Sequence, residues 1–539
     1  MQYTANFAHQ KSPEYKFLKS VNRKIIQRFL WSLDHPKESQ QKVFAHMIAN
    51  IHNTDFAKEH NVSSRVSMED FRRDIPIRSY DDLFPWLSQY HRTQNNSITK
   101  AKVLSFVETS GTTAQPKWIP VTKRWAATIK EAQALWTLSM IHDHPMVATG
   151  KALTMVSPAE HAKTQGGFVV GSNTGRMQKD QAWWIPKKYP IPNEVFAISS
   201  NEVKQYVYLR FALQEHITSW TTANPSMLLL LCRRLEEWKA FFTEDLRKGT
   251  LRCGPATELT FEQRSFFEAK LMATAPPFDW RPAKIWPLAV VNCWKGGSAS
   301  FFLSRLRESL GGDVPIREVG ITASEGYFAL PLGSDWDGGV LWTQGHLLEF
   351  VDKQNTSFWS WELEVGKQYR LVITTETGLV RYDLKDVVEV VGFCSQTPVI
   401  RFVGKYGRFL NAVGEKLSEE QIARAMNEVI TSTNSHIVGF TAHIKWGDIP
   451  YIEVGYEGRL PLEFQEELDR SLCRQNIEYE AKRTSQRLGP PQIIHFSEGT
   501  YNRYRNHRIQ EGAPAGQIKD PILAISEEEW MRVLKVSKE

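Results

Sequence analysis

An apolar run that leads directly into a loop of small hydroxyl residues is the feature that most restricts the fold of this chain. The run KVLSFV occupies residues 102–107, and the loop ETSGTTAQPK follows at residues 108–117. The apolar run predicts a buried strand, and the Gly, Ser, Thr and Pro residues predict a turn. A helical pattern begins beyond the loop, where Thr122 is placed to cap a helix that contains Trp125 and Ile129. The stretch therefore predicts a strand–loop–helix unit.

The composition of this loop is suited to holding an anion. Consecutive backbone N–H groups can surround a phosphate, hydroxyls add donors, and the N-terminus of the following helix adds positive potential. A lysine at the end of such a loop supplies a mobile charge for the outer phosphates. The GxxxxGK[ST] pattern is absent, and a solvated turn before a helix is the alternative interpretation. The candidate phosphate-binding residues are Ser110, Gly111, Thr112, Thr113 and Lys117.

Length and composition limit the classes of protein to which the chain can belong. With 539 residues, of which 42% are hydrophobic and 23% are charged, we expect a globular protein of two or more domains. The net charge of +6 is small for this length, which argues against the dense basic surface of a dedicated nucleic-acid-binding protein. We therefore expect a small-molecule partner and no nucleic-acid partner.

Cysteine usage and the apolar segments indicate the compartment. The five cysteines show no CxxC spacing, which argues against a disulfide framework and against a zinc site. The first 16 residues contain no apolar signal core, and the most apolar short run, MLLLLC at 227–232, is too short to span a bilayer. We expect a cytoplasmic protein that does not insert into a membrane. The sequence leaves the oligomeric state open, and a monomer is compatible with it.

The order of the apolar patterns predicts an α/β fold. Residues 13–57 carry apolar side chains at intervals of four, which predicts helices. A strand at 283–293, a helix at 298–310 and a strand at 314–321 predict a largely parallel, helix-covered sheet. Short alternating runs between 338 and 392 predict antiparallel strands of a barrel or a second sheet. The apolar positions of the first region include Phe17, Val21, Ile25 and Phe29.

A polar, glycine-punctuated segment at 402–416 precedes a smaller domain. It leads into Ser418-Glu-Glu-Gln421, which fits a capping box at the start of an amphipathic helix. A hairpin, a helix at about 462–482 and a strand at 492–496 complete an α+β pattern. The predicted architecture has a large N-terminal domain, residues 1–402, with helix-covered β-sheets and a small barrel-like sheet. A smaller, mobile α+β C-terminal domain, residues 403–539, follows after the hinge.

A second polar stretch, GITASEGY at 320–327, follows a predicted buried strand. It presents Thr322, Ser324 and Glu325. A carboxylate at the end of a strand, facing a phosphate loop from a neighbouring strand, is suited to hold Mg²⁺ between phosphates. A polar turn is the alternative interpretation.

A third stretch, TTETGLVRYDLKDVVEVV at 374–391, gathers charged residues before a strand. A carboxylate such as that of Asp383 or Asp386 is suited to accept hydrogen bonds from a ribose diol. The alternative interpretation is a surface ion-pair network around Arg381 and Lys385.

The order and spacing of the three stretches resemble the adenylate-forming enzymes, which include acyl-CoA synthetases, adenylation domains and luciferases. Within that superfamily the chain is most similar to the auxin-responsive acyl-acid amido synthetase family. The family's phosphate motif, SSGTTxGxxK, is matched by TSGTTAQPK at 109–117. Its nucleotide motif, Y(G/A)SSE, is matched by ITASE at 321–325, and its RYRVGDVV motif by RYDLKDVV at 381–388. Ordered matches extend from Thr54 to Pro521, which is far more specific than any one motif.

The resemblance implies an enzyme that uses ATP and Mg²⁺. In its first step a carboxylic acid attacks the α-phosphate of ATP, giving an acyl adenylate and pyrophosphate. In its second step an amine, usually an amino acid in this family, displaces AMP and forms an amide. The catalytic residues that the resemblance implies are Lys117 and Lys519, with Lys519 reaching the α-phosphate from the small domain. The nucleotide-binding residues that it implies are Ser110, Gly111, Thr112, Thr113, Thr322, Ala323, Ser324, Glu325, Asp386, Lys405 and Lys416, with Glu325 also holding Mg²⁺.

The resemblance also places a hinge and part of an acyl pocket. The small domain would rotate near Lys405 and Tyr406 between the two steps. The stretch CWKGGSASFF at 293–302 lies where the family builds part of the acyl pocket, which Trp294, Gly296 and Gly297 would line. A tight strand–helix turn with a core tryptophan is the alternative interpretation of this stretch.

Three positions depart from the family pattern. Ile321 replaces a tyrosine that lies against adenine, Ala114 replaces the glycine of the phosphate motif, and Lys385 replaces the glycine of the ribose motif. One alternative is therefore a nucleotide-binding relative without turnover, and another is formation of an acyl-CoA thioester. A third alternative is an RNA-binding protein, because TYNRYRNHRIQ at 500–510 interleaves rings and cations.

Overall fold

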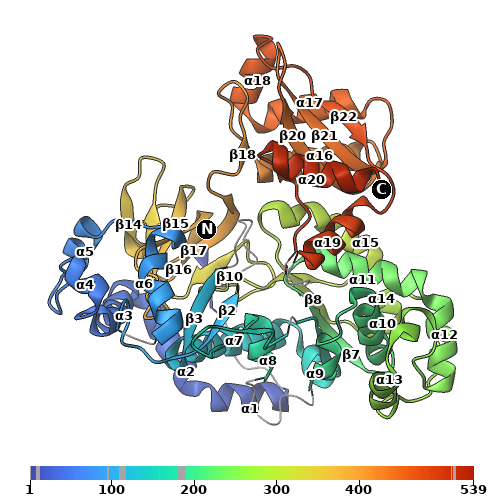
Figure 1. Ribbon diagram of the computed structural model, residues 1–539, viewed down its shortest axis with the longest axis horizontal. Coiled ribbons are helices and arrows are strands. Elements are labelled where there is room, and N and C mark those ends of the chain that lie inside the picture. The colour runs from blue at the N-terminus through green and yellow to red at the C-terminus, as the bar shows by residue number, and fades with distance from the viewer. Residues whose placement is uncertain are drawn as a thin grey trace. The chain divides into compact units, whose positions relative to one another are not determined.

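The computed structural model describes residues 2–5, 7, 12–93, 96–108, 117–156, 158–179, 188–511, 513 and 518–539 (Figure 1). The chain divides into two compact units. The first unit comprises Met1–Trp294 and Arg305–Phe402, and the second comprises Lys295–Ser304 and Val403–Glu539. None of the described helices is long and apolar enough to cross a membrane.

The expected helices of the N-terminal region are present, but they do not share one apolar face. The chain breaks at Asn22 between the first two helices, so the four-residue interval does not continue from one to the next. Phe17 and Val21 are exposed, whereas Phe29 is completely buried. The helices are α1 (Pro13–Val21), α2 (Arg23–Asp34), α3 (Pro36–Ile51), α4 (Asp55–Glu59), α5 (Met68–Asp74) and α6 (Tyr80–Thr93).

The predicted strand–loop–helix unit is wrong in one respect, because a second strand lies between the loop and the helix. Strand β2 (Val103–Glu108) pairs antiparallel with β3 (Trp118–Thr122), and α7 (Lys123–Asp143) starts only after β3. The β-branched residues of WIPVT favour this strand. Thr122 caps α7 as expected, since its Oγ1 accepts from the Trp125 backbone N–H at 3.1 Å. The loop therefore does not run directly into a helix N-terminus.

The expected parallel, helix-covered sheet is confirmed. Its order is β4-β7-β8-β9, and all three pairings are parallel. Helices α10, α11 and α14 lie beside it (Figure 1), and the apolar run at 227–232 is a buried part of α11. The strands are β4 (Lys151–Thr154), β7 (Ile217–Thr221), β8 (Val290–Cys293) and β9 (Ile316–Glu318). The helices that follow β4 are α8 (Asn173–Lys179), α9 (Asn193–Phe196), α10 (Asn201–Ala212), α11 (Pro225–Glu237), α12 (Lys239–Lys248), α13 (Phe261–Glu268), α14 (Pro282–Ile285) and α15 (Leu303–Leu310).

Two strands of this region are shorter than expected. The predicted strand at 283–293 begins as α14, because Pro282 is pre-set for a first helical turn, and only its second half is β8. The predicted strand at 314–321 ends at Glu318, and Gly320 at φ +101° turns the chain into a different sheet. A Cβ at Gly320 would lie 2.5 Å from the Ala329 carbonyl oxygen, so only glycine fits there.

Residues 321–405 build a second sheet, one of the two alternatives predicted for the alternating runs. Within the described residues its order runs β10-β11-β12-β17-β16-β15-β13-β14, with β1 (Gln2–Tyr3) beside β16. Among the strands that the structure describes, this path is open, because β10 and β14 at its two ends are not paired with each other. The strands are β10 (Ile321–Ala323), β11 (Gly326–Leu330), β12 (Gly339–Leu341), β13 (Leu347–Val351), β14 (Ser357–Trp359), β15 (Gln368–Thr374), β16 (Tyr382–Cys394) and β17 (Thr397–Lys405). A smaller sheet has the order β3-β2-β6-β5, with β5 (Ala162–Lys163) and β6 (Val169–Gly171).

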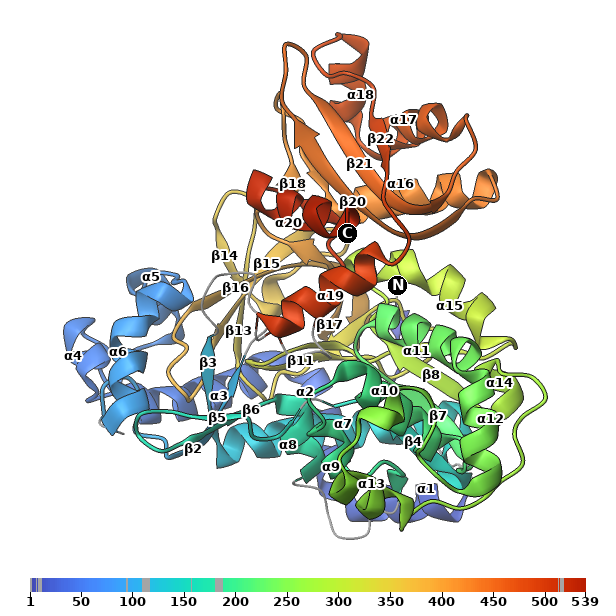
Figure 2. The same cartoon turned by 45° about the vertical axis from the view of Figure 1, so that its right-hand side comes forward.

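The second unit has the expected α+β pattern, and the capping box at Ser418 and Gln421 is present. Its sheet has the order β22-β21-β20-β23, and helices cover both faces (Figure 2). The predicted helix at about 462–482 is divided at Asn476, which caps its second half. The elements are β18 (Phe409–Leu410), β19 (Leu417–Ser418), α16 (Glu419–Ser432), β20 (His436–Lys445), β21 (Tyr451–Arg459), α17 (Phe464–Gln475), α18 (Ile477–Thr484), β22 (Gln492–His495), α19 (Thr500–Gln510), β23 (Leu523–Ala524) and α20 (Glu527–Ser537).

Candidate functional site

Lys117 lies between two tyrosine rings of the first unit. It directly precedes β3, and its Nζ is 3.4 Å from the Tyr382 hydroxyl oxygen, to which it donates. The same Nζ lies 5.5 Å from the ring centroid of Tyr80 and 5.8 Å from that of Tyr382. The electron-rich face of Tyr80 attracts an ammonium at this range, whereas the contact with Tyr382 is made at the ring edge, beside the hydroxyl. These contacts fix the direction in which Lys117 extends.

Glu325 also interacts with the Tyr382 side chain. It occupies the turn between β10 and β11, is buried, and forms a side-chain hydrogen bond with Tyr382. Burial, and next the negative charge of Glu325, raise the pKa of Tyr382 well above its ordinary range. The phenol is therefore neutral and donates to the carboxylate. Burial also raises the pKa of Tyr80, to about 12, and the charge of Glu325 contributes to that shift.

Asp386 follows an irregularity in β16, the strand that begins with Tyr382. Its negative charge is a further cause of the raised pKa of Tyr382. In the pairing with β15, Asp386 is opposite Leu371 while Asp383 is opposite Val372, so two residues of β16 are extra. One of them, Lys385, adopts φ +59°. This bulge leaves Lys385 exposed and Asp386 buried.

Lys117 thus donates to a phenol that interacts with Glu325 and on which the charge of Asp386 also acts. The sequence reasoning named these three residues but missed Tyr382. A signal was available, because Tyr382 and Asp386 are four residues apart on a predicted strand and therefore share a face. The roles of all three residues toward a nucleotide remain predictions.

Neighbouring elements hold the turn that carries Glu325. The indole Nε1 of Trp125 donates to the Glu325 backbone oxygen at 2.9 Å. The Ser324 hydroxyl donates to the Glu108 backbone oxygen at 3.2 Å, which ties the turn to the last residue of β2. Thr322 and Ala323 lie in β10 and are partly buried. The candidate nucleotide motif therefore lies next to the residue from which the hydroxyl-rich loop departs.

A buried carboxylate that the sequence reasoning did not select supports this arrangement. Glu376 accepts a hydrogen bond from the Thr122 hydroxyl and a second from the imidazole of His46. Thr122 is the cap of α7, the helix that carries Trp125. Glu376 therefore anchors the first turn of α7 and, through Trp125, the position of Glu325.

Several predicted site residues lie elsewhere. Ser110, Gly111, Thr112 and Thr113, together with the departure Ala114, fall outside the described residues. In the second unit are Gly296, Gly297, Lys405, Lys416 and Lys519, and the three lysines are exposed. Trp294 follows β8 in the first unit, and its backbone N–H donates to the Ala223 oxygen at 2.8 Å. Ile321 packs at the edge of the large core, as an apolar residue is expected to do.

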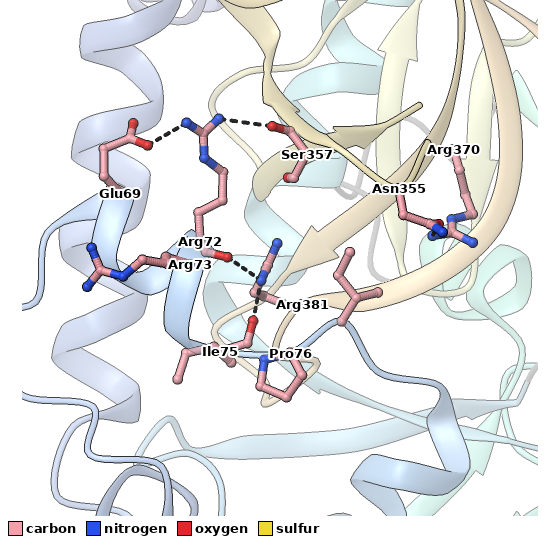
Figure 3. Close-up of a pocket in the computed structure, with 10 residues that line it drawn as sticks. Glu69, Arg72, Arg73, Ile75, Pro76, Asn355, Ser357, Arg370 and Arg381 are labelled. Atoms are coloured by element: carbon pink, nitrogen blue, oxygen red, sulfur yellow. Dashed lines mark hydrogen bonds and ion pairs between the residues drawn. The ribbon is translucent and has the colours of Figure 1, made fainter. Parts of the chain in front are cut away.

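Arg381 does not belong to a surface ion-pair network, so that alternative interpretation is wrong for this residue. It is buried and paired with Glu349, with 2.7 Å between Nη2 and Oε2. Its guanidinium also donates to the backbone oxygens of Arg72, at 2.5 Å, and Ile75 (Figure 3). Arg381 directly precedes β16 and adopts φ +45°, so the turn that leads into the strand sends its side chain to Glu349.

Arg381 borders an open pocket of about 700 Å³ in the first unit (Figure 3). Its arginines are already matched by carboxylates: Arg72 by Glu69 and Arg370 by Asp383, at 2.5 Å and 3.5 Å. The pocket is therefore close to neutral and offers no surplus of positive charge for an anion. Its lining consists of Glu69, Arg72, Arg73, Ile75, Pro76, Ile77, Asn355, Ser357, Arg370 and Arg381.

The run that motivated an RNA-binding interpretation forms α19, and its cations contact the same unit. Arg505 pairs with Asp520, and Arg508 pairs with Glu511 at 2.6 Å. The Arg503 Nε donates to the Val536 backbone oxygen at 2.8 Å, and Tyr501 is buried. Internal packing accounts for this pattern without a nucleic acid.

No group of three or more His, Cys, Asp and Glu side chains within the described part of the chain is arranged to hold a metal ion. Glu325 is a single buried carboxylate. A cation bound there would need further oxygen ligands, and phosphates and water commonly supply these for Mg²⁺.

Comparison with known proteins covers nearly the whole chain. Three domain models of the GH3 family match it: the N-terminal domain at residues 25–316, the central domain at 339–405 and the C-terminal domain at 420–528. Indole-3-acetic acid-amido synthetase GH3.4 of Arabidopsis thaliana is 23% identical, over 90% of this chain and 89% of that protein. Jasmonoyl–L-amino acid synthetase JAR6 of Nicotiana attenuata is 21% identical, over 92% and 93%.

Solved structures show the same fold. GH3.15 acyl acid amido synthetase superimposes with a TM-score of 0.83 at 17% identity, covering 98% of this chain and 97% of that one. A 2-hydroxyisobutyryl-CoA ligase in its postadenylation state gives a TM-score of 0.56 at 12% identity, covering 100% and 98%. The predicted α/β fold class is thereby confirmed.

Proposed function

Because the chain belongs to the GH3 family, we propose that it is an adenylate-forming acyl-acid amido synthetase. It would use ATP to activate a carboxylic acid and would transfer the acyl group to an amine, most simply an amino acid. The observation that carries this proposal is that Lys117 donates to the Tyr382 hydroxyl, while the charges of Glu325 and Asp386, from two other parts of the chain, act on the same phenol.

The residues of this cluster fit a magnesium–nucleotide complex. Lys117 offers an ammonium held by two rings, and we assign it, with Ser110, Gly111, Thr112 and Thr113, to the β- and γ-phosphates. Glu325 would hold Mg²⁺, with Thr322, Ala323 and Ser324 beside the nucleotide, and Asp386 would bind the ribose diol. When bound, Mg²⁺ supplies positive charge that offsets the charge of the phosphates.

In the proposed first step a carboxylate oxygen bonds to the α-phosphorus, and the bond between that phosphorus and the bridging oxygen of pyrophosphate breaks. Both reactants are anionic, so fixed cations must lie where negative charge accumulates. Lys117 supplies one such charge. Lys519, on the second unit, is assigned to the α-phosphate.

In the proposed second step the amine nitrogen attacks the acyl carbon, AMP leaves with the bonding electrons, and the nitrogen loses a proton. We assign the change between the steps to a rotation of residues 403–539 relative to residues 1–402, near Lys405 and Tyr406. Trp294, Gly296 and Gly297 are assigned to the acyl side of the site. The names of the relatives that act on indole-3-acetic acid or jasmonate do not fix the acid used here.

The decisive experiment measures pyrophosphate release by the full chain with MgATP and a panel of aromatic, fatty and benzoic acids. Each acid is tested with an amino-acid mixture, with coenzyme A and with neither, and the products are identified by mass spectrometry. We expect amide products and a loss of about 100-fold or more in Lys117→Ala and Glu325→Ala. The matched control Lys123→Ala changes an exposed lysine of α7 and should keep wild-type activity.

Three results would contradict the proposal in different ways. Thioester products in place of amides would identify an acyl-CoA ligase. ATP binding without pyrophosphate release from any acid would indicate a relative without turnover. Full activity of both Lys117→Ala and Glu325→Ala would refute the site assignment.

A further inference from the structure

The Tyr382 hydroxyl lies between the two groups of opposite charge that the proposed reaction needs. It accepts from the Lys117 ammonium at 3.4 Å and donates to the Glu325 carboxylate. We propose that Tyr382 is a positioning residue, whose hydroxyl holds the phosphate-binding lysine and the magnesium-binding carboxylate in place before MgATP binds. This inference rests on the proposed function.

A phenol suits this position because it accepts and donates at the same time. A phenylalanine ring would keep the packing but could do neither. Without the phenol, the Lys117 ammonium and the Glu325 carboxylate would attract each other directly, and MgATP would have to overcome that attraction before binding. With the phenol, each charge interacts with a neutral hydroxyl, which a phosphate or a hydrated cation can replace.

The backbone on both sides of Tyr382 is held firmly. The Arg78 backbone N–H donates to the Arg381 oxygen at 2.9 Å, and the Asp383 N–H donates to the Arg78 oxygen at 2.8 Å. The buried pair of Arg381 with Glu349 holds the residue that directly precedes Tyr382. Tyr382 itself is only 4% exposed. A side chain placed so rigidly can position a flexible lysine.

The test compares two nucleotides that differ in the phosphates assigned to Lys117 and Glu325. MgATP carries the β- and γ-phosphates, and AMP lacks them. In Tyr382→Phe we expect the Kd for MgATP to rise about tenfold, as for the loss of a hydrogen bond to a charged group, while the Kd for AMP changes little. Both are measured by isothermal titration calorimetry on the full chain.

A matched control separates positioning from loss of stability. Tyr90→Phe removes another buried hydroxyl, which donates to the Ala101 backbone oxygen at 2.7 Å, away from the cluster. It should leave the affinities for both nucleotides unchanged. An equal loss of affinity for MgATP and AMP in Tyr382→Phe would indicate a merely structural role and would overturn the inference, as would unchanged binding of MgATP.

Wild-type protein provides a second readout, which does not depend on the folding of a variant. Acetic anhydride labelling followed by mass spectrometry should acetylate Lys117 about fivefold or more slowly than the exposed Lys123, because the phenol and rings hold its ammonium. Equal rates would overturn the inference. If wild-type protein binds neither MgATP nor AMP, the proposed function itself fails, and that result is distinct from every outcome above.

Discussion

Acidification should destabilise the first unit through one buried histidine, His346. This residue lies just before β13, is 3% exposed, and its Nδ1 has no hydrogen-bond partner in the described part of the chain. Burial, and next the positive charge of Arg124, lower the pKa of His346 from 6.5 to about 4. A Cβ at Gly326 would lie 2.3 Å from its Nε2, so the ring fills the space behind the turn that carries Glu325.

The sign and size of the effect follow from this pKa. As the pH falls below the ordinary value, the unfolded chain binds a proton that the folded chain refuses, so stability is present at neutral pH and is lost on acidification. A lowering of about 2.5 pKa units corresponds to about 3 kcal/mol once the pH has fallen through both values. Between about pH 7 and about pH 5, the part lost is about 2 kcal/mol.

The assay compares urea unfolding of wild type and His346→Gln, followed by tryptophan fluorescence, at several pH values in this range. Glutamine cannot titrate, so the variant should lose about 2 kcal/mol less than wild type on acidification, whatever its stability at neutral pH. The control His216→Gln changes an exposed histidine of the same unit and should keep the wild-type slope. If His346→Gln also keeps that slope, the buried imidazole is not the acid-sensitive group, and the reasoning is refuted.

Two further predictions concern the strand that carries Tyr382. Arg381→Met should lower the free energy of unfolding in urea by about 3–5 kcal/mol, because Glu349 would remain buried without its partner. Adding Glu349→Leu should recover much of that loss. If the effects of the two substitutions simply add in the double variant, the prediction is wrong. Lys385→Gly should stabilise the protein by up to about 1 kcal/mol because Lys385 adopts φ +59°, whereas Lys42→Gly, within α3, should destabilise it by a similar amount. A lower stability of Lys385→Gly would show that its conformation carries no strain.

The sequence predicted most elements whose signal is local. The Thr122 cap, the capping box at Ser418 and the strand ending at Glu108 each depend on a few neighbouring residues, and each is present. Strand β3 was missed because five residues that contain a proline read as a loop before a helix. The break at Gly320 was missed because a sequence does not show that a neighbouring carbonyl excludes a Cβ.

The sequence predicted individual residues of the candidate site, but it did not predict Tyr382, with which they interact. Lys117, Glu325 and Asp386 were named from motif resemblance, and no local pattern brings them together. Tyr382 lies in a buried, alternating strand, where an aromatic residue is ordinarily part of the core. Only the packing of β3, β10 and β16 shows that its hydroxyl faces both charges. Arg381 is the opposite case: it is a charged residue in a recognised motif, and yet it lies in the interior and pairs with Glu349.

The irregularity in β16 also has a consequence for the strand beyond it. Because it inserts an even number of residues, the inward and outward directions of the side chains are the same before and after it: Tyr382, Leu384, Asp386, Val388 and Val390 are all buried. Removing only Lys385 would exchange the inward and outward directions of the side chains beyond it and would turn Val388 and Val390 toward solvent. Removing the pair Leu384–Lys385 would keep the core intact and move only Asp386. The strand can therefore gain or lose residues here two at a time, so the position of one carboxylate can change without altering the sheet.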